Sequence, residues 1–343
     1  MRSLMLVAPL LLMSGCNLFR SGLIDKTCED LPLGCGGIID TQPTDDTGDS
    51  DPWVPENPYT TGMALAVASD GEIQLRVIDA QGQQIQGASL DSSEVSAAGP
   101  VAYDPIQPRV MLWDNGGQTL FVVADGAQPV RVTVDTSEAA ELGWVNDAVV
   151  VDSVLYLVSA TAIWSFLPGD SAIHKLGSAV GLTQIQGVFP AYDDNLFLLN
   201  WGSDDAPDLY RYTISTAENR LSYEAFDDSL GRVAAGFQGP AAKPHVCSGV
   251  GGLYLVEDLQ GGDHAPAAFP SQADLQALVG ADLLAEVTDC GWDDGAERYL
   301  VHSAVHGVVA VDTWGRVDAL VLPEPGEQFV RASFFVVPEP DAR

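Results

Sequence analysis

Residues able to carry out chemistry are sparse in this chain of 343 residues, and none falls into a common catalytic pattern. The sequence has no G-x-S-x-G, no H-E-x-x-H and no P-loop, so it lacks the signatures of serine hydrolases, zinc proteases and nucleotide hydrolases. His302 and His306 are close in sequence, but such a pair beside a turn more often belongs to the core or the surface than to a metal site. We assign no catalytic residue and no metal ligand. Enzymatic activity stays open, with a non-catalytic protein favoured.

Two acidic pairs are the remaining candidates for metal binding. Asp193-Asp194 and Asp293-Asp294 each follow a predicted strand, and carboxylates in such loops can converge on one face to bind calcium. Aspartate is also an ordinary turn residue, and no matching set of Glu or Asn accompanies these pairs. We therefore expect turns at both places and no cofactor, with calcium as the alternative.

The N-terminus has the composition of an export signal, with a basic residue near the start, an apolar run over residues 4–13 and small residues at 14–15. The run is too short to span a bilayer, which takes ~20 residues as a helix. The segment LMSGC, which ends at Cys16, resembles the lipobox of bacterial lipoproteins. This resemblance implies cleavage before Cys16, lipidation of that cysteine, palmitate included, and, from Asn17, sorting to the outer membrane.

Five cysteines fit an oxidising compartment, because lipidation of Cys16 leaves an even number. The remaining four, Cys28, Cys35, Cys247 and Cys290, allow three disulfide pairings. We favour Cys28 with Cys35, which closes a short loop, and Cys247 with Cys290, which ties two parts of the body together. Metal ligation is the alternative, but there is no C-x-x-C and the histidines do not cluster near the cysteines.

Residues 40–59, DTQPTDDTGDSDPWVPENPY, contain no basic residue and almost no aliphatic one. Such a segment cannot bury a core, so the sequence predicts a disordered spacer there. We accordingly divide the chain into a signal peptide (residues 1–15), a lipidated N-terminus with an acidic Pro/Thr/Asp linker (16–62) and a folded domain (63–343).

The charge balance limits the partners. Against 15 Lys and Arg stand 48 Asp and Glu, which give a net charge of -33 at pH 7. Nucleic-acid phosphates and anionic headgroups would repel such a chain, so we exclude nucleic acid. We expect the membrane to be reached through the lipid anchor alone, and a protein or glycan of the cell envelope to be the partner.

The folded domain consists of short Val, Leu, Tyr and Phe runs separated by Asp, Gly, Asn and Pro, which predicts many short strands. Six apolar strand centres can be aligned, with successive spacings of 45, 45, 41, 57 and 45 residues: Ala66, Met111, Tyr156, Phe197, Tyr254 and Tyr299. Four strands every ~45 residues is the period of a β-propeller blade. The strands are apolar at consecutive positions, which fits sheets packed on both faces.

The first unit lacks a leading strand, whereas the C-terminus offers an unmatched one at residues 329–337. We therefore predict an all-β protein, a propeller of about six four-stranded blades with seven as the alternative, closed by the C-terminal strand joining the first blade. We place Cys247 and Cys290 in the leading strands of consecutive blades. No WD-repeat, Kelch or sialidase Asp-box pattern is present, so we name no propeller subfamily.

Anchor, spacer and propeller together predict a lipoprotein of the cell envelope, attached to the outer membrane and facing either the periplasm or the cell surface. We expect the propeller to be a non-catalytic binding scaffold. The alternative is a metal-dependent hydrolase or lactonase, as in gluconolactonase-like propellers. Carboxylates gathered at the mouth of the central channel would favour this alternative.

Overall fold

The computed structural model describes residues 61–134, 139–167, 169–178, 182–191, 195–201, 207–224, 233–249, 252–260, 266–268, 273, 277 and 287–336. Several predictions therefore lie outside the described residues. They concern the signal peptide, the linker up to residue 60, Cys16, Cys28, Cys35 and the pair Asp193-Asp194.

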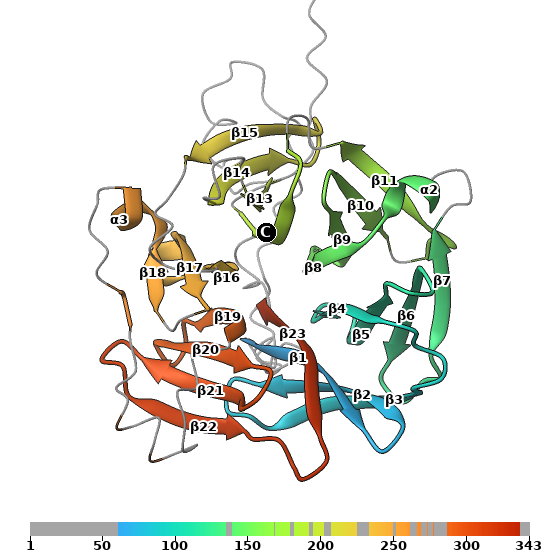
Figure 1. The fold of residues 1–343 in the computed structure, drawn as a ribbon, viewed down its shortest axis with the longest axis horizontal. Helices are drawn as coiled ribbons and strands as arrows, with labels where there is room; N and C mark the ends of the chain where they lie inside the picture. The colour runs from blue at the N-terminus through green and yellow to red at the C-terminus, as the bar shows by residue number, and fades with distance from the viewer. Residues whose placement is uncertain are drawn as a thin grey trace, which may run out of the picture. The chain divides into compact units, whose positions relative to one another are not determined.

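The described strands form six antiparallel units arranged around a common centre, as Figure 1 shows. The first three blades are β23 (Gln328–Val336), β1 (Thr61–Ser69), β2 (Glu72–Asp79) and β3 (Gln84–Asp91); β4 (Ala98–Asp104), β5 (Arg109–Asp114), β6 (Thr119–Ala124) and β7 (Val130–Val134); and β8 (Val145–Val151), β9 (Val154–Ser159), β10 (Ala162–Phe166) and β11 (Ala172–Ser178). The last three are β12 (Ile185–Pro190), β13 (Asn195–Trp201), β14 (Pro207–Thr213) and β15 (Glu218–Tyr223); β16 (Val233–Gln238), β17 (Pro244–Ser248) and β18 (Leu253–Leu255); and β19 (Val287–Asp293), β20 (Arg298–Ser303), β21 (Gly307–Asp312) and β22 (Val317–Val321).

Helices are short in the described part of the chain: α2 (Ala139–Leu142), α3 (Val256–Gln260) and the 3-10 turn Pro240–Ala242. Within the residues the structure describes, no helix has the length and apolar character needed to cross a membrane. The all-β fold class predicted from the strand repeat is confirmed.

The first strand of each blade is the innermost, and these strands contact one another in cyclic order from β23 through β4, β8, β12, β16 and β19 back to β23. The core consists of six apolar clusters, each formed between two neighbouring blades. Both faces of a blade are thus buried, which is why β5 and β10 are buried at every position and apolar at most of them. The second and third blades make one further contact, because their outer strands, β7 and β11, pair in parallel.

The ring closes as the sequence predicts, because C-terminal strand β23 pairs antiparallel with β1 and completes the first blade. Gly291 of β19 allows the closing strand to approach: a Cβ at that position would lie 2.0 Å from Cγ of the Phe334 ring. Side chains larger than hydrogen at residue 291 would therefore push the closing strand away from its neighbour.

The fifth blade corrects one detail of the repeat alignment. Its first strand is β16, which begins at Val233, and the predicted leading strand around Cys247 is instead the second strand, β17. Tyr254, aligned as a second-strand centre, lies in the third strand, β18. The sequence VAAGFQ of β16 is rich in small residues, so its hydrophobicity did not mark it as a strand.

Candidate functional site

The first strands of the blades share a one-residue irregularity close to their beginning. In β8 the pairing steps from Val145 to Asp147, and in β19 from Val287 to Asp289. The other four first strands make a corresponding step, between Phe329 and Arg331, Ala98 and Val101, Ile185 and Gly187, and Val233 and Ala235. The residues after the step occupy equivalent places around the ring, and three of them are charged: Asp147, Asp289 and Arg331.

Asp147 and Asp289, which we call the axial carboxylate pair, belong to the third and sixth of six blades and therefore face each other across the ring. Both are the third residue of an innermost strand, so they lie at the same end of the ring, where the first strands begin. We call this the entry end. The connections from one blade to the next arrive there, as do the turns between second and third strands, because successive strands of a meander alternate in direction.

Backbone N–H groups hold both carboxylates in place. The N–H of Ala148 donates to Oδ1 of Asp147 over 2.8 Å, and the N–H of Val188, in the next blade, donates to Oδ2 over 2.9 Å. Oδ2 of Asp289 accepts a bond of 2.8 Å from the N–H of Phe334, also in the next blade. Each side chain thus spans a junction between two blades and keeps a defined orientation.

Burial dominates the electrostatics of the pair. It raises the pKa of Asp147 to about 6, although two backbone N–H bonds and the charge of Arg331 act in the opposite direction. Burial, and next the negative charge of Asp147, raise the pKa of Asp289 well above its usual range. Two carboxylates that repel each other in a poorly solvated place titrate as a pair, with one proton retained to a higher pH.

The pair is enclosed by protein yet keeps contact with solvent. Asp147 and Asp289 are partly buried as residues, and the equivalent positions of the fourth and fifth blades are the small residues Gly187 and Ala235. Three residues before Asp147, Trp144 is 55% exposed, which is unusual for so large an apolar side chain. Carboxylates, small neighbours and an exposed indole at one end of a ring are suited to bind a ligand.

Of the two acidic pairs considered for metal binding, the described one, Asp293-Asp294, is engaged in ion pairing and hydrogen bonding within the sixth blade. Asp293 pairs with Arg298, whose guanidinium also donates to the carbonyl of Ala80 over 2.6 Å. Asp294 accepts a bond of 3.1 Å from the indole N–H of Trp292. Across the described ranges, no three His, Cys, Asp or Glu side chains are grouped so that they could share a metal ion.

The two histidines, His302 and His306, lie in different surroundings. His302 is fully buried, its Nδ1 lies 2.5 Å from Oγ1 of Thr288, and burial lowers the pKa of the imidazole to about 3. His306 occupies the turn between β20 and β21 and is only partly buried. The buried ring packs against Phe329, so His302 is a neutral core residue at the junction of the sixth and first blades.

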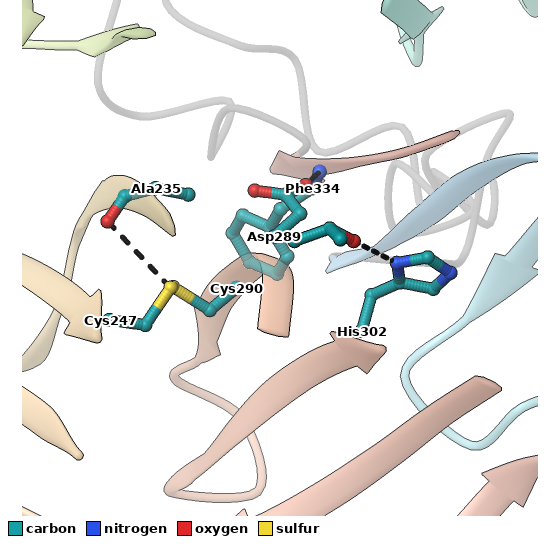
Figure 2. The surroundings of a disulfide bond; sticks show 7 residues. Ala235, Cys247, Asp289, Cys290, His302 and Phe334 are labelled. Atoms are coloured by element: carbon teal, nitrogen blue, oxygen red, sulfur yellow. Dashed lines mark hydrogen bonds between the residues drawn. A yellow bond between two sulfur atoms is a disulfide. The ribbon is translucent and has the colours of Figure 1, made fainter. Parts of the chain in front are cut away.

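Cys247 and Cys290 form the predicted disulfide, which joins the fifth blade to the sixth. Its strand placement corrects the prediction in part, because Cys247 lies in the second strand, β17, and only Cys290 lies in a first strand, β19. The bond therefore connects the second strand of the fifth blade to the first strand of the sixth. Cys290 directly follows Asp289, so the disulfide anchors the segment that carries one member of the axial carboxylate pair (Figure 2).

Sequence reasoning did not single out Asp147, Asp289 or Arg331. A signal was present, since residues 145–148 and 287–290 read V-N-D-A and V-T-D-C, an aspartate between valine and a small residue in two leading strands. The pair was missed because an aspartate inside a predicted strand has no chemical meaning until its partner, 142 residues away by subtraction, is known to lie opposite.

No known family of sequences matches this chain, and no curated protein resembles it in sequence. Its fold is similar to that of a chain in a crystal structure of a nidogen/laminin complex, with a TM-score of 0.56 and 11% identity over 80% of this chain and 98% of that one. This likeness supports the β-propeller fold and says nothing of function.

Two enzymes are more distant in structure. Virginiamycin B lyase from Staphylococcus aureus gives a TM-score of 0.45 at 9% identity, over 72% of each chain. A gluconolactonase from Xanthomonas campestris gives 0.46 at 13% identity, over 77% of this chain and 88% of that one. The chain is a β-propeller protein, a class that includes both binding proteins and enzymes.

Proposed function

We propose that this chain is a lipid-anchored protein of the outer membrane whose β-propeller is a binding module, with the entry end as its binding face. The observation that carries the proposal is the axial carboxylate pair, two carboxyl side chains held in fixed orientation on opposite blades at an end of the ring that also exposes Trp144. Oriented polar groups beside small and apolar ones are typical of ligand sites.

The charges support a binding role. An ionised carboxylate in a poorly solvated place is costly unless a partner compensates it, and Arg331 is one cation set against two aspartates. A protein or glycan that brings hydrogen-bond donors to the entry end would supply that compensation. The acidic composition of the whole chain favours the same class of partner over polyanions.

The test is site-specific photo-crosslinking in cells that produce the full chain. A photoreactive residue replaces Trp144 at the entry end or, as the matched control, Asp318, which is exposed on the outer strand β22. We expect a discrete crosslinked species from position 144 and none from position 318. The species should disappear when Asp147 and Asp289 are both changed to Asn. Equal crosslinking from the two positions, or persistence of the species in the double variant, would overturn the proposal.

A second candidate function, acid–base catalysis, rests on the same carboxylate pair, since carboxylates at the mouth of the channel were expected to favour an enzyme. Asp147 and Asp289 have different surroundings, so that one can be ionised while the other holds a proton, the arrangement that general acid–base enzymes use.

Hydrolysis of chromogenic lactones and esters by the purified full chain distinguishes this candidate. Catalysis by the pair requires a pH–rate profile with a limb near pH ~6, where Asp147 titrates, and loss of that limb in Asp147→Asn. A rate equal to that of buffer at every pH would remove the enzyme candidate and leave the binding module.

A further inference from the structure

The turn between β21 and β22 presents a tryptophan to solvent that its own geometry does not require. Trp314, at the tip of this turn, is 84% exposed. The backbone N–H groups of Trp314 and Arg316 donate to Oδ1 of Asp312 over 2.8 and 2.9 Å. The N–H of Asp312 in turn donates to the carbonyl of Arg316 over 2.9 Å. The bonds that fix the turn thus come from the aspartate and the backbone, so the indole is not needed to form it.

The first blade contains the same turn with a different residue at its tip. Asp79 accepts bonds from the N–H groups of Gln81 and Gln83 over 2.9 and 2.7 Å. The glycine of this turn has a φ of 81°, against 82° for the glycine of the sixth-blade turn. Exposed Gln81 occupies the place of Trp314. Because glutamine suffices to form the turn, the exposure of so large an apolar side chain needs an explanation outside the fold.

Trp314 lies at the end of the ring where the chain joins the propeller. Thr61, where β1 begins, pairs with Val336, which is itself 52% exposed. The residue after Thr61 pairs with the last residue of β2, so the β2–β3 turn lies at the same end. At the start of β20, beside the turn of Trp314, the guanidinium of Arg298 donates over 2.6 Å to the carbonyl of Ala80 in the β2–β3 turn. Both turns thus lie at the end opposite to the entry end, which we call the tether end.

The segment that joins the propeller at Thr61 carries the lipid anchor of the proposed function. Cys16 precedes Thr61 by 45 residues, by subtraction. A flexible chain of that length has an end-to-end distance of about 40 Å, so an anchored propeller stays near the bilayer and its tether end is nearest to the point of attachment. Such confinement gives an effective concentration on the order of millimolar, at which a contact too weak to bind a free protein is populated.

We propose that the tether end of the propeller rests on the membrane that holds the anchor, with the indole of Trp314 inserted among the lipid headgroups. The inference rests on the lipid anchor of the proposed function and adds a non-covalent contact to it. Tryptophan suits this place because its ring is apolar while its N–H stays hydrated, the property that concentrates it at membrane–water interfaces.

Arg316 supports the same contact. Its side chain is 77% exposed, and its ion pair with Asp312 through Nε leaves the terminal N–H groups of the guanidinium as donors for lipid phosphate. With the tether end on the membrane, the entry end faces away from it, where a binding partner can reach the axial carboxylate pair.

The experiment is fluorescence quenching of the lipidated full chain, reconstituted in vesicles of phosphatidylcholine brominated near the top of its acyl chains. Zwitterionic lipid is used because the net charge of -33 repels anionic lipid. Trp53, in the segment before the propeller, is changed to Phe in every sample so that it adds no signal. We expect bromine to quench the parent chain, Trp314→Gln to abolish this quenching, and Trp144→Gln, at the entry end, to leave it unchanged.

A gain-of-function variant tests the orientation of the propeller. Gln81→Trp places an indole on the equivalent turn at the same end, so it should restore quenching to Trp314→Gln. Failure to restore it, quenching that persists in Trp314→Gln, or quenching that disappears in Trp144→Gln would overturn the proposal. An unquenched parent chain, the result if a protein or a second copy covers Trp314 instead, would overturn it as well.

Flotation of the same vesicles separates this inference from the proposed function. A chain that does not float with the vesicles overturns the lipid anchor and the membrane contact together. A chain that floats and is not quenched overturns the membrane contact alone. Photo-crosslinking from position 144 should be unchanged by Trp314→Gln, because the two residues lie at opposite ends of the ring.

Discussion

Replacing Asp147 by asparagine should make the propeller more stable at neutral pH, which is unusual for a change at a candidate functional residue. Burial raises the pKa of this carboxyl from 3.8 to about 6. The folded state therefore binds the proton more tightly than the unfolded state, and stability falls as pH rises from the lower value to the higher. Asparagine resembles the protonated acid and does not ionise, so the variant escapes this loss.

The magnitude follows from the size of the shift. A difference of about two pKa units corresponds to about 3 kcal/mol of unfolding free energy, since each unit is worth about 1.4 kcal/mol. Nearly all of this stabilisation by protonated Asp147 is lost by about pH 7, and about one third of it is already lost at about pH 4.5. The free energy of unfolding of Asp147→Asn minus that of the wild type should therefore increase by about 2 kcal/mol between about pH 4.5 and about pH 8.

Urea unfolding followed by circular dichroism at both pH values measures this difference. The altered hydrogen bonding to Ala148 and Val188 changes the unfolding free energy of the variant by the same amount at each pH, so that contribution cancels. Asp318→Asn is the matched control and should give no pH-dependent difference, as its side chain is exposed. A difference between Asp147→Asn and wild type that stays constant from acid to neutral pH would refute the reasoning. Asp147 would then be solvated like a surface aspartate.

Three further predictions concern the disulfide, an ion pair within the second blade and the anchor. Changing Cys247 and Cys290 to Ala should lower the unfolding free energy by about 2–4 kcal/mol, since the bond closes a loop of 43 residues; denaturant unfolding measures the loss, and an unchanged midpoint would contradict it. Arg109→Met should cost about 3–5 kcal/mol, because it leaves buried Asp104 without its ion pair; the double change with Asp104→Asn should recover part of that loss, and no recovery would argue against pairing as the cause. Cys16→Ala should release the chain from membranes into the soluble fraction on cell fractionation, and a chain that still sediments with membranes would refute lipid anchoring.

Much of the architecture could be predicted from local pattern. Turn residues and apolar runs repeat because every blade must form the same meander and bury both faces, so the strand order and closure by β23 were accessible from the sequence. The alignment went wrong where the pattern weakens, in the fifth blade, because the small residues of β16 are buried by their neighbours and not by their own hydrophobicity.

The sequence by itself therefore determined the class of fold and its closure, and it favoured the pairing of Cys247 with Cys290 among three possible ones. Only the tertiary structure decided which charged residues meet. Asp147 and Asp289 are distant in the chain and come to face each other because a ring of six blades places the third opposite the sixth. Their raised pKa values arise from that enclosure, a long-range property that no window of residues contains.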